Sequence, residues 1–341
     1  MNPEESQRSV VQASQDQSLV FDEFKERLTR SPEGWYKTNL PWKANHAPLP
    51  RNKEGSLRRL KNLGKKLQQE ALTAQYDAII QDQLREGIIE KAPPVSQPEK
   101  GFYIPFKSVI GESGETMKLW IVFDASAQAT SDAPILNDCL YPGPALQNKH
   151  WDVLIQQRAY PVVLAGDIKN AFLQIRIHES ERNALHFHWQ TDLIKDKQKY
   201  RFTRVLLGLA PSPFLLGGVL ECHLETWAAR YAEEVERLRR SFYVDGLLTG
   251  SIDIQQTQTR KKIAQEIMRN ATFELHKWHS NQPQLEDSGH PEDQSFAKQQ
   301  LQVKPSKSKL LGVKWNKIED TIAVQFPSEV TQRPNLKFWP K

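Results

Sequence analysis

Two stretches of the sequence decide the fold of this chain, LAGDIKNAFLQI at residues 164–175 and FYVDGLLT at residues 242–249. In each of them an apolar run that favours a β-strand ends at one aspartate, Asp167 in the first and Asp245 in the second. A segment that favours a helix begins at Ser212-Pro213 between them. If the two strands are neighbours, both carboxylates lie at one edge of a sheet. Paired carboxylates at such an edge are what a two-Mg²⁺ phosphoryl-transfer site requires.

The second stretch also has a purely structural interpretation. The dipeptide Asp245-Gly246 is a strong hairpin-turn signal, because glycine supplies the positive φ that such turns need. On this interpretation residues 243–246 are only the tip of a hairpin. A single aspartate after an apolar strand is usually a loop residue, so neither carboxylate indicates a function by itself.

Length and composition exclude several classes of protein. The 341 residues suffice for two domains or one elaborate domain, and a net charge of +5 is compatible with a polyanionic partner without requiring one. Cys139 and Cys222 are too few and too far apart for a disulfide framework or a zinc site. The polar N-terminus lacks a signal-peptide pattern, and the longest apolar stretch, residues 205–220, is shorter than the ~20 residues of a spanning helix. We therefore expect a cytoplasmic protein, in a reducing compartment, with no membrane partner.

The remaining sequence alternates between helix and strand patterns. Apolar spacing predicts helices over residues 57–67, 73–86, 212–240 and 254–269. In the third of these, Ser212 is the expected N-cap and Pro213 the first helical residue. Apolar runs separated by turn residues predict hairpins that pair residues 102–110 with 118–123, 185–189 with 200–207, and 310–315 with 321–326.

The first of these helices carries the most concentrated positive charge. Its leucines, at positions 57, 60, 63 and 67, follow one helical face, and basic side chains cover the rest. This charge is either a face that follows nucleic-acid phosphates or an ordinary solvated helix face. The candidate nucleic-acid-binding residues are Arg58, Arg59, Lys61, Lys65 and Lys66.

Histidine pairs are a weaker signal. His186 and His188 alternate on one strand, and His276 and His279 flank Trp278. No matching cysteine or acidic set lies near either pair in the sequence, so metal binding by histidine is disfavoured.

The order of segments resembles a known family, the reverse-transcriptase region of Pao/BEL-type long-terminal-repeat retrotransposon polyproteins. The resemblance covers roughly residues 35–326, and each block is weak alone but stands in the family's order. The blocks are LPWK at 40–43, EGIIE at 86–90, VFDAS at 122–126, LND at 136–138, GP at 143–144, GDIKNAFLQ at 166–174, Gly208 with SPF at 212–214, FYVD at 242–245, LLTG at 247–250, KW at 277–278, SN at 280–281 and LGVKW at 311–315.

This resemblance implies an α+β fold, a right-hand polymerase with fingers and palm, in which an antiparallel palm sheet packs on helices. It divides the chain into four regions. These are a polar, weakly ordered lead-in or linker at 1–45, a fingers-like region with N-terminal basic helices at 46–159, a palm-like catalytic region at 160–281, and a linker with a terminal hairpin, the start of a thumb or connection, at 282–341. Protease, ribonuclease H and integrase segments are missing from this pattern, so we expect a fragment or a truncated reading frame.

The resemblance also implies a site. Asp167 and Asp245 resemble the catalytic carboxylates, which would hold two Mg²⁺ ions against the primer 3′-hydroxyl and the nucleotide triphosphate. Phe172 resembles the bulky gate that crowds a ribose 2′-hydroxyl, and Gly208 resembles a residue whose backbone lies near the incoming nucleotide. The implied partners are an RNA or DNA template–primer and deoxynucleoside triphosphates.

Two positions depart from the family pattern. The catalytic block of the family ends in two aspartates, and here Gly246 replaces the second. The family carries an arginine that contacts the triphosphate where this chain has Trp120, which offers no bidentate charged contact. The missing carboxylate predicts weak binding of the second Mg²⁺. The missing arginine removes a positive contact to the phosphate, so both departures predict impaired catalysis. The sequence therefore leaves two main hypotheses, an impaired RNA-directed DNA polymerase domain and a non-catalytic nucleic-acid-binding protein derived from a retroelement. A third, weaker hypothesis is the translation of a pseudogene that gives no stable product.

Overall fold

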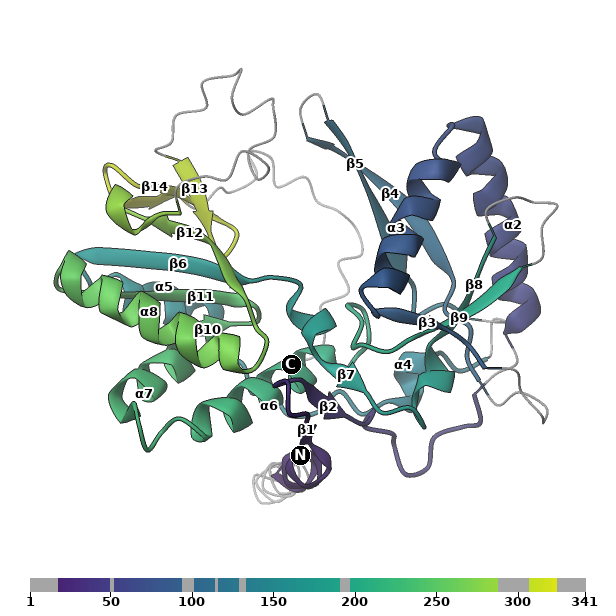
Figure 1. Cartoon of the computed structure of the whole chain (residues 1–341), viewed down its shortest axis with the longest axis horizontal. Helices are drawn as coiled ribbons and strands as arrows, with labels where there is room; N and C mark the ends of the chain where they lie inside the picture. Colours follow the sequence, from purple (N-terminus) through teal and green to yellow (C-terminus); the bar gives the residue numbers. More distant parts are fainter. Residues whose placement is uncertain are drawn as a thin grey trace, which may run out of the picture.

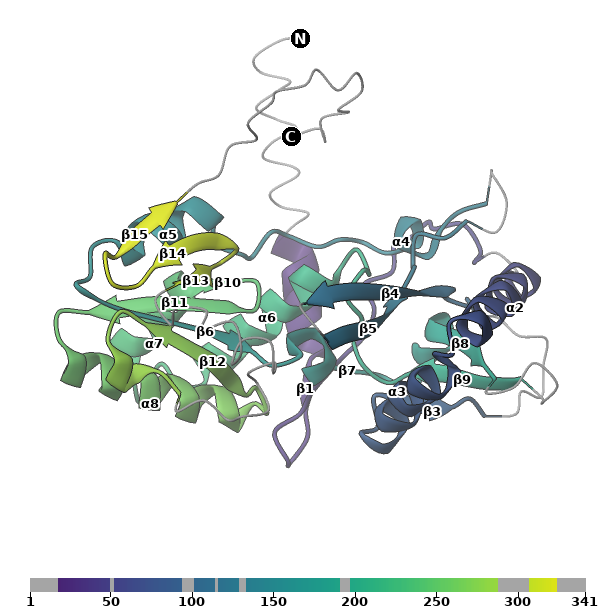
Figure 2. The same ribbon diagram turned by 90° about the horizontal axis from the view of Figure 1, so that it is seen from above.

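The computed structural model describes two halves and the strands that join them, as Figures 1 and 2 show. One half is built around strand β6 and the other around the hairpin of β4 and β5. The described residues are 18–49, 52–93, 101–113, 116–128, 133–190, 197–287 and 307–323, of which only the backbone is described at 108–113, 116–120 and 307–309.

A four-stranded antiparallel sheet with the order β10-β11-β6-β12 forms the centre of the first half. Leu164 and Ile168 of β6 belong to the main core, as do Val235 and Ile267 from the helices that cover this face. The strands are β6 (Val162–Ile168), β10 (Phe242–Tyr243), β11 (Gly246–Ser251) and β12 (Leu275–Ser280), and the helices are α6 (Ser212–Glu225), α7 (Ala232–Ser241) and α8 (Ile254–Asn270).

The opposite face of this sheet packs against a smaller layer. Val163 and Leu248, which alternate with the residues of the main core, cluster with Leu154, Leu310 and Trp315. This layer contains helix α5 and a three-stranded antiparallel sheet, visible above β6 in Figure 2. Its elements are α5 (His150–Gln157), β13 (Lys307–Leu310), β14 (Val313–Asn316) and β15 (Thr321–Ala323).

The second half combines the helices α2, α3 and α4 with two small sheets. Leu60, Leu63 and Leu67 are buried on one face of α2, whereas the basic residues of that helix are exposed. β4 and β5 form a hairpin, and β3, β9 and β8 form a three-stranded antiparallel sheet in that order. The elements are α2 (Lys53–Gln69), α3 (Thr73–Arg85), α4 (Leu136–Cys139), β3 (Ile89–Lys91), β4 (Phe106–Ser113), β5 (Thr116–Phe123), β8 (His186–Trp189) and β9 (Gln198–Phe202).

Another small sheet lies between the halves in both views (Figures 1 and 2). β1 pairs antiparallel with β2, and β2 pairs parallel with β7. β7 follows the aspartate strand β6 through a short 3-10 helix, so this sheet is directly connected to the central sheet. The elements are β1 (Thr29–Arg30), β2 (Tyr36–Thr38), β7 (Arg176–Ile177) and the 3-10 helix η1 (Ala171–Gln174).

The expected α+β class, with an antiparallel sheet packed on helices, is confirmed. The helices over 57–67, 73–86 and 254–269 and the hairpin of β8 with β9 are also found. The division into fingers and palm stays a prediction. Within the described residues, no helix combines the length and apolar character that crossing a membrane requires.

Three sequence-based expectations are wrong. Residues 18–45 are not a weakly ordered lead-in, because they contain β1 and β2 and bury Phe24 and Tyr36 in the core. The helix predicted over 212–240 is interrupted between α6 and α7, at residues 226–231. Its N-cap is Pro211 rather than Ser212, whose hydroxyl instead donates to the carbonyl oxygen of Leu206 at 2.5 Å. Residues 324–326 of the last predicted hairpin lie outside the described residues.

Candidate functional site

The structure brings Asp167 and Asp245 to the same end of the central sheet. Asp167 lies near the end of β6, where its register partners are Gly246 on β11 and His276 on β12. Asp245 immediately precedes Gly246, and its carbonyl oxygen accepts a hydrogen bond from the Ile168 amide at 2.8 Å. Both aspartates are exposed. Three adjacent strands therefore present position 246, Asp167 and His276 in one row.

The turn that carries Asp245 differs from the predicted one. Tyr243 pairs with Gly246, so the hairpin loop consists of Val244 and Asp245, and Gly246 belongs to the strand. The positive φ falls on Val244, at 56°, rather than on the glycine. A β-branched residue in this region of φ is strained, and such strain concentrates at functional sites. The expectation that Gly246 is the turn residue with positive φ is therefore wrong.

Gly246 leaves space that a neighbouring side chain occupies. A Cβ atom built on Gly246 would lie 3.8 Å from Oδ1 of Asp167, so the missing side chain belongs on the same face as that carboxylate. The same Cβ would lie 2.6 Å from Cδ2 of Leu311, in the turn between β13 and β14. The terminal sheet thus covers the position where the resembled family carries its second aspartate.

The ionisation of Asp167 reflects its surroundings. Although the surface of Asp167 is exposed, surrounding protein atoms desolvate its carboxyl and raise the pKa above its ordinary value. The negative charge of Asp245 raises this pKa further. Lys277 and His276 act in the opposite direction but do not compensate. Burial in turn lowers the pKa of His276, the register partner of Asp167. Two acidic groups are therefore close enough to repel one another, and a bound cation would relieve that repulsion.

A cavity of about 650 Å³ lies between the central sheet and the terminal sheet, next to Asp167. Cationic and aromatic side chains line it from two strands. They include Lys277 and His279 of β12, and Lys314 and Trp315 of β14. The cavity therefore places positive charge beside the carboxylate edge, which suits an anionic ligand.

Asp167 and Asp245 are the residues at this edge of the sheet that could hold Mg²⁺. Carboxylate oxygens are the ligands that Mg²⁺ prefers, and Asp167 on β6 and Asp245 in the hairpin loop before β11 supply them. No group of three or more acidic, histidine or cysteine side chains able to hold a metal occurs among the residues that the structure describes. When bound, Mg²⁺ would supply positive charge to an attacking hydroxyl or a phosphate oxygen.

Phe172 and Gly208, the two predicted nucleotide-binding residues, lie on the segments that follow β6 and β9. Phe172, in η1, is partly buried against the core. Gly208 has a φ of 101°, a conformation that side chains rarely adopt. Asn137 holds this turn, because its amide donates to the carbonyl oxygen of Gly208 at 3.0 Å and accepts from the Ala210 amide at 2.8 Å.

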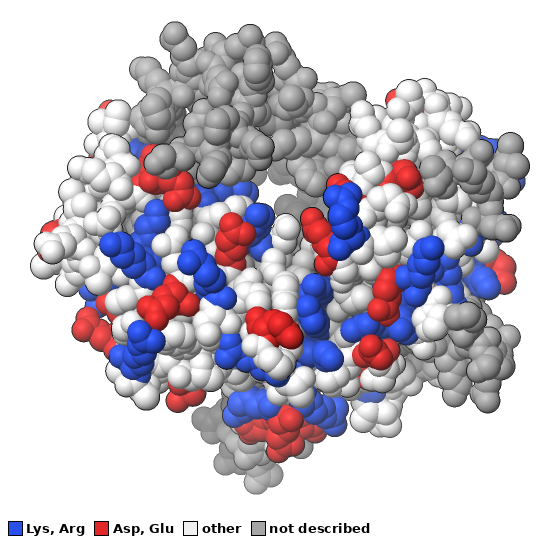
Figure 3. Space-filling view, in the orientation of Figure 1, with Lys and Arg blue, Asp and Glu red and all other residues white. Residues whose placement is uncertain are grey.

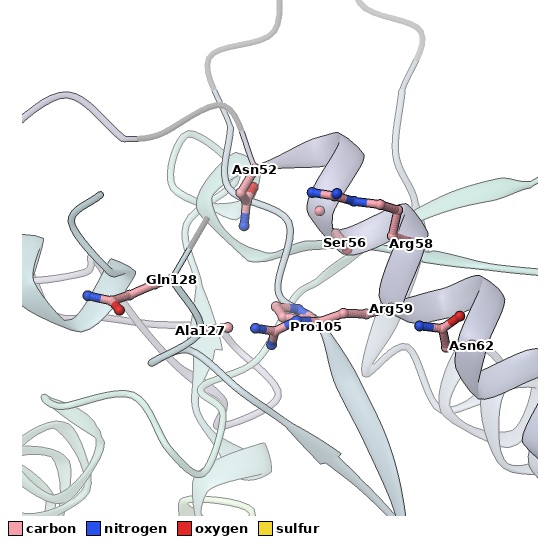
Figure 4. Close-up of a pocket in the computed structure, with 9 residues that line it drawn as sticks. Asn52, Ser56, Arg58, Arg59, Asn62, Pro105, Ala127 and Gln128 are labelled. Carbon is pink, nitrogen blue, oxygen red and sulfur yellow. The ribbon is translucent and has the colours of Figure 1, made fainter. Parts of the chain in front are cut away.

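The predicted basic helix face is exposed on α2. Arg58 and Arg59 line a cavity of about 330 Å³, and Arg59 extends toward the loop that carries Ala127 and Gln128 (Figure 4). Arg59 also lies 3.7 Å from Asp124, and Lys66 lies 3.7 Å from Glu70. The other two candidates, Lys61 and Lys65, are exposed and do not line this cavity.

The basic helix and the carboxylates lie in different halves of the molecule, with α2 at the outer edge of its half in Figures 1 and 2. Figure 3 shows Lys and Arg side chains spread over both halves and interspersed with Asp and Glu. Any polyanion that contacts both sites would therefore have to reach from one half to the other. Trp120, which replaces the expected arginine, pairs through its backbone with Val109 in the β4–β5 hairpin, and its side chain lies outside what the structure describes.

The sequence did not indicate the residues that shape this site although they lie far from the aspartates in the chain. The contact of Leu311 with position 246 links segments far apart in the chain, and no local pattern indicates it. Asn137 and Lys277 belong to blocks that resemble the family, but their roles depend on interactions with Gly208 and Asp167. Such interactions become visible only in three dimensions.

Comparisons with family models and with curated proteins give no match. Among solved structures, the chain is similar to the foamy viral protease-reverse transcriptase in complex with double-stranded DNA, with 16% sequence identity and a TM-score of 0.39 over 69% of this chain and 32% of that one. It is also similar to the foamy viral protease-reverse transcriptase in complex with an RNA/DNA hybrid, with 14% identity and a TM-score of 0.46 over 81% of this chain and 31% of that one. The chain thus spans about a third of the length of these proteins.

Proposed function

We propose that this chain is a reverse-transcriptase-like domain that binds a nucleic-acid template–primer and is impaired in nucleotide transfer. The observation that supports this most is the placement of Asp167 and Asp245 at one end of an antiparallel sheet, with Gly246 directly opposite Asp167. Two carboxylates in this position suit metal-assisted phosphoryl transfer. The glycine at the third position removes a ligand for the second ion.

The finer parts of the proposal come from the sequence blocks. They assign the chain to a Pao/BEL-type retrotransposon and its halves to fingers and palm. The substrates would be deoxynucleoside triphosphates on an RNA or DNA template, with Mg²⁺ held by Asp167 and Asp245. Each missing carboxylate removes an anionic oxygen from a hard cation, so the second Mg²⁺ would bind weakly.

A primer-extension assay tests this proposal. Four proteins are compared on an RNA template with Mg²⁺: the unmodified chain, Gly246→Asp, Trp120→Arg and the double variant. We expect little or no extension by the unmodified chain and the largest gain in the double variant, because both changes act on one metal–triphosphate complex. Asp167→Asn in the double variant is the control and should abolish the gain. Full activity of the unmodified chain would show that two carboxylates suffice.

A second candidate function is template–primer binding without catalysis. The contact of Leu311 with position 246 favours it, because an apolar side chain then stands where a metal ligand would be. If the double variant gains no activity and template–primer binding is retained, this alternative is the better account. Equilibrium binding to a labelled template–primer, measured on the same four proteins, separates the two functions.

A further inference from the structure

Three cationic residues lie side by side on the strands that join the two halves. Lys37 of β2 is the register partner of Arg176 of β7, and Arg176 is the partner of Arg204 across an isolated antiparallel bridge. Side chains of directly opposite residues project to the same side of a sheet. Like charges in this arrangement repel one another, so the row is unfavourable unless an anion compensates it.

An aromatic ring holds two of these cations in place. The guanidinium carbons of Arg176 and Arg204 lie 4.6 and 4.2 Å from the ring centroid of Trp35. The ring attracts both cations without neutralising them. Within the described part of the chain, Lys37, Arg176 and Arg204 form no ion pair. The pKa of the Glu33 carboxyl is lowered chiefly by hydrogen bonds to Ser31 and to the backbone. The positive charge of Arg176 lowers this pKa by a smaller amount.

Arg204 is the least satisfied of these residues. Its side chain is 5% exposed, and its Nε and Nη1 groups are buried without a hydrogen-bond partner among the described residues. Burial lowers the pKa of Arg204 to about 10, and the charges of Arg176 and Arg182 add to this effect. Burying an unpaired charge destabilises a folded protein.

A neighbouring arginine shows how the same chain satisfies a buried guanidinium. Arg182 is 8% exposed, and it donates to the carbonyl oxygen of Ile177 at 3.0 Å and to the carboxylate of Glu90 at 3.0 Å. Arg201 shares that carboxylate at 2.6 Å. Among the residues that the structure describes, the chain provides an anionic partner for these two arginines and none for Arg176 and Arg204. The missing anionic partner therefore lies outside the described residues.

We infer that Trp35, Lys37, Arg176 and Arg204 form a phosphate-binding site whose ligand is a phosphodiester group of a nucleic-acid strand. A phosphate supplies negative charge and several acceptor oxygens to guanidinium and ammonium donors. Lys37, Arg176 and Trp35 are partly exposed and can contact it, whereas Arg204 contributes charge from beneath the Trp35 ring. The inference rests on the proposed nucleic-acid binding but not on catalysis by Asp167 and Asp245.

The first test measures binding of a fluorescently labelled single-stranded oligothymidylate by anisotropy over a range of salt concentrations. The double variant Lys37→Gln/Arg176→Gln should bind at least about tenfold more weakly at low salt. Its slope of log affinity against log salt should be shallower by about 1.4, since each phosphate contact on a single strand contributes about 0.7. The matched control Arg85→Gln/Arg230→Gln removes the same charge from arginines that pair with Asp82 and Glu266, and should keep the original slope.

The second test measures thermal unfolding with inorganic phosphate or with chloride at equal ionic strength. Phosphate should raise the Tm of the unmodified chain. Arg204→Met should raise the Tm in chloride, because it removes a buried unpaired charge, and should reduce the gain from phosphate. Arg182→Met is the matched control and should lower the Tm, because it leaves Glu90 with one partner fewer.

The outcomes separate this inference from the proposed function. If the chain binds no oligonucleotide but phosphate still raises its Tm through Arg204, the proposed function and the phosphodiester ligand both fail, and the site binds free phosphate instead. If the oligonucleotide binds with an unchanged salt slope in Lys37→Gln/Arg176→Gln, and phosphate has no effect on the Tm, the inference is overturned and the proposed function is not.

Discussion

The carboxylate of Asp167 lies beside a glycine on the neighbouring strand of the central sheet. Gly246 is its register partner on β11, and a Cβ atom built on that glycine would lie 3.8 Å from Oδ1 of Asp167. Leu311 fills part of the same space from the terminal sheet. The absence of a carboxylate and the covering of its position by an apolar side chain are thus one structural feature. A substitution that restores the carboxylate at position 246 therefore adds negative charge beside Asp167 and crowds Leu311.

Gly246→Asp should therefore destabilise the chain by about 1–3 kcal/mol, the usual cost of overpacking. The new Cβ would meet Cδ2 of Leu311 at 2.6 Å, and the new charge would lie beside Asp167. Leu311→Ala should relieve the steric part, so that the double variant is destabilised by less than the sum of the two single effects. Urea denaturation of the four proteins in a double-mutant cycle measures this coupling.

Gly246→Ala is the control for that cycle, because it adds the Cβ without the charge. If Gly246→Ala and Gly246→Asp couple equally to Leu311→Ala, the clash alone explains the cost. Strictly additive effects would show that Leu311 does not restrict position 246.

Asp167→Asn should raise the Tm at neutral pH. Because the pKa of Asp167 is raised in the folded state, that state holds its proton more tightly than the unfolded chain does, and stability falls as pH rises through this range. Asparagine removes the effect, so the difference from the unmodified chain should disappear as pH falls below the ordinary carboxyl pKa. Mg²⁺ should raise the Tm of the unmodified chain and have less effect on Asp167→Asn. Thermal unfolding at several pH values measures both expectations, and a Tm lowered by the substitution at neutral pH would contradict them.

Local patterns predict the elements around this site better than the site itself. The leucine spacing of α2 and the apolar run of β6 depend on neighbouring residues, and both predictions are correct. The interruption between α6 and α7 does not follow from the sequence pattern, because α6 is apolar on most sides and its two glycines, Gly217 and Gly218, lie inside the helix rather than at the interruption. The turn at Val244 is unexpected for a similar reason, since the sheet register overrides the preference of glycine for positive φ.

Gly208→Ala should destabilise the chain by about 1–3 kcal/mol through backbone strain alone. Its φ is 101°, yet an added Cβ would contact only the carbonyl oxygen of Phe123, at 3.6 Å. Gly55→Ala is a matched control, because Gly55 lies in α2 with nothing within 4 Å of the added Cβ. That control should stabilise the chain by roughly 0.5–1 kcal/mol. Urea denaturation of both variants measures the difference, and similar effects at the two positions would contradict this expectation.

His223 should make the chain sensitive to acid. It is fully buried, its Nε2 donates to the carbonyl oxygen of Ile267 at 2.7 Å, and its Nδ1 lies 3.1 Å from the Tyr36 hydroxyl. Burial lowers the pKa of His223 to about 4. The unfolded chain therefore binds a proton that the folded chain excludes between about pH 6.5 and pH 4, and stability falls as pH decreases through this window.

The destabilisation attributable to His223 is on the order of 3 kcal/mol. His223→Gln can keep a donor toward Ile267 and an acceptor toward Tyr36 without titrating, so its stability should depend less on pH. Denaturation at neutral pH and at two points inside the window compares the two proteins. Parallel pH profiles would show that other groups cause the acid sensitivity.

The exposed cations of α2 should contribute to template–primer affinity. Arg58, Lys61 and Lys65 are exposed and have no ion-pair partner among the described residues, whereas Arg59 and Lys66 lie near carboxylates. Replacing the three unpaired cations by glutamine should make the salt dependence of duplex binding shallower by about 0.9 for each phosphate that is no longer neutralised. Affinity should fall without a change in sequence preference, because phosphate contacts carry no sequence information.

A matched triple variant removes the same charge from Lys25, Arg85 and Arg230, each of which pairs with a carboxylate. These cations are already compensated within the chain, so their removal should change the salt slope little. Anisotropy titrations of a labelled duplex at several salt concentrations measure both variants. Equal slopes in the two variants would mean that net charge, rather than the α2 face, attracts the nucleic acid. An unchanged slope in the α2 variant would remove this helix from the binding surface and leave the phosphate-binding site of Trp35, Lys37, Arg176 and Arg204 as the better candidate.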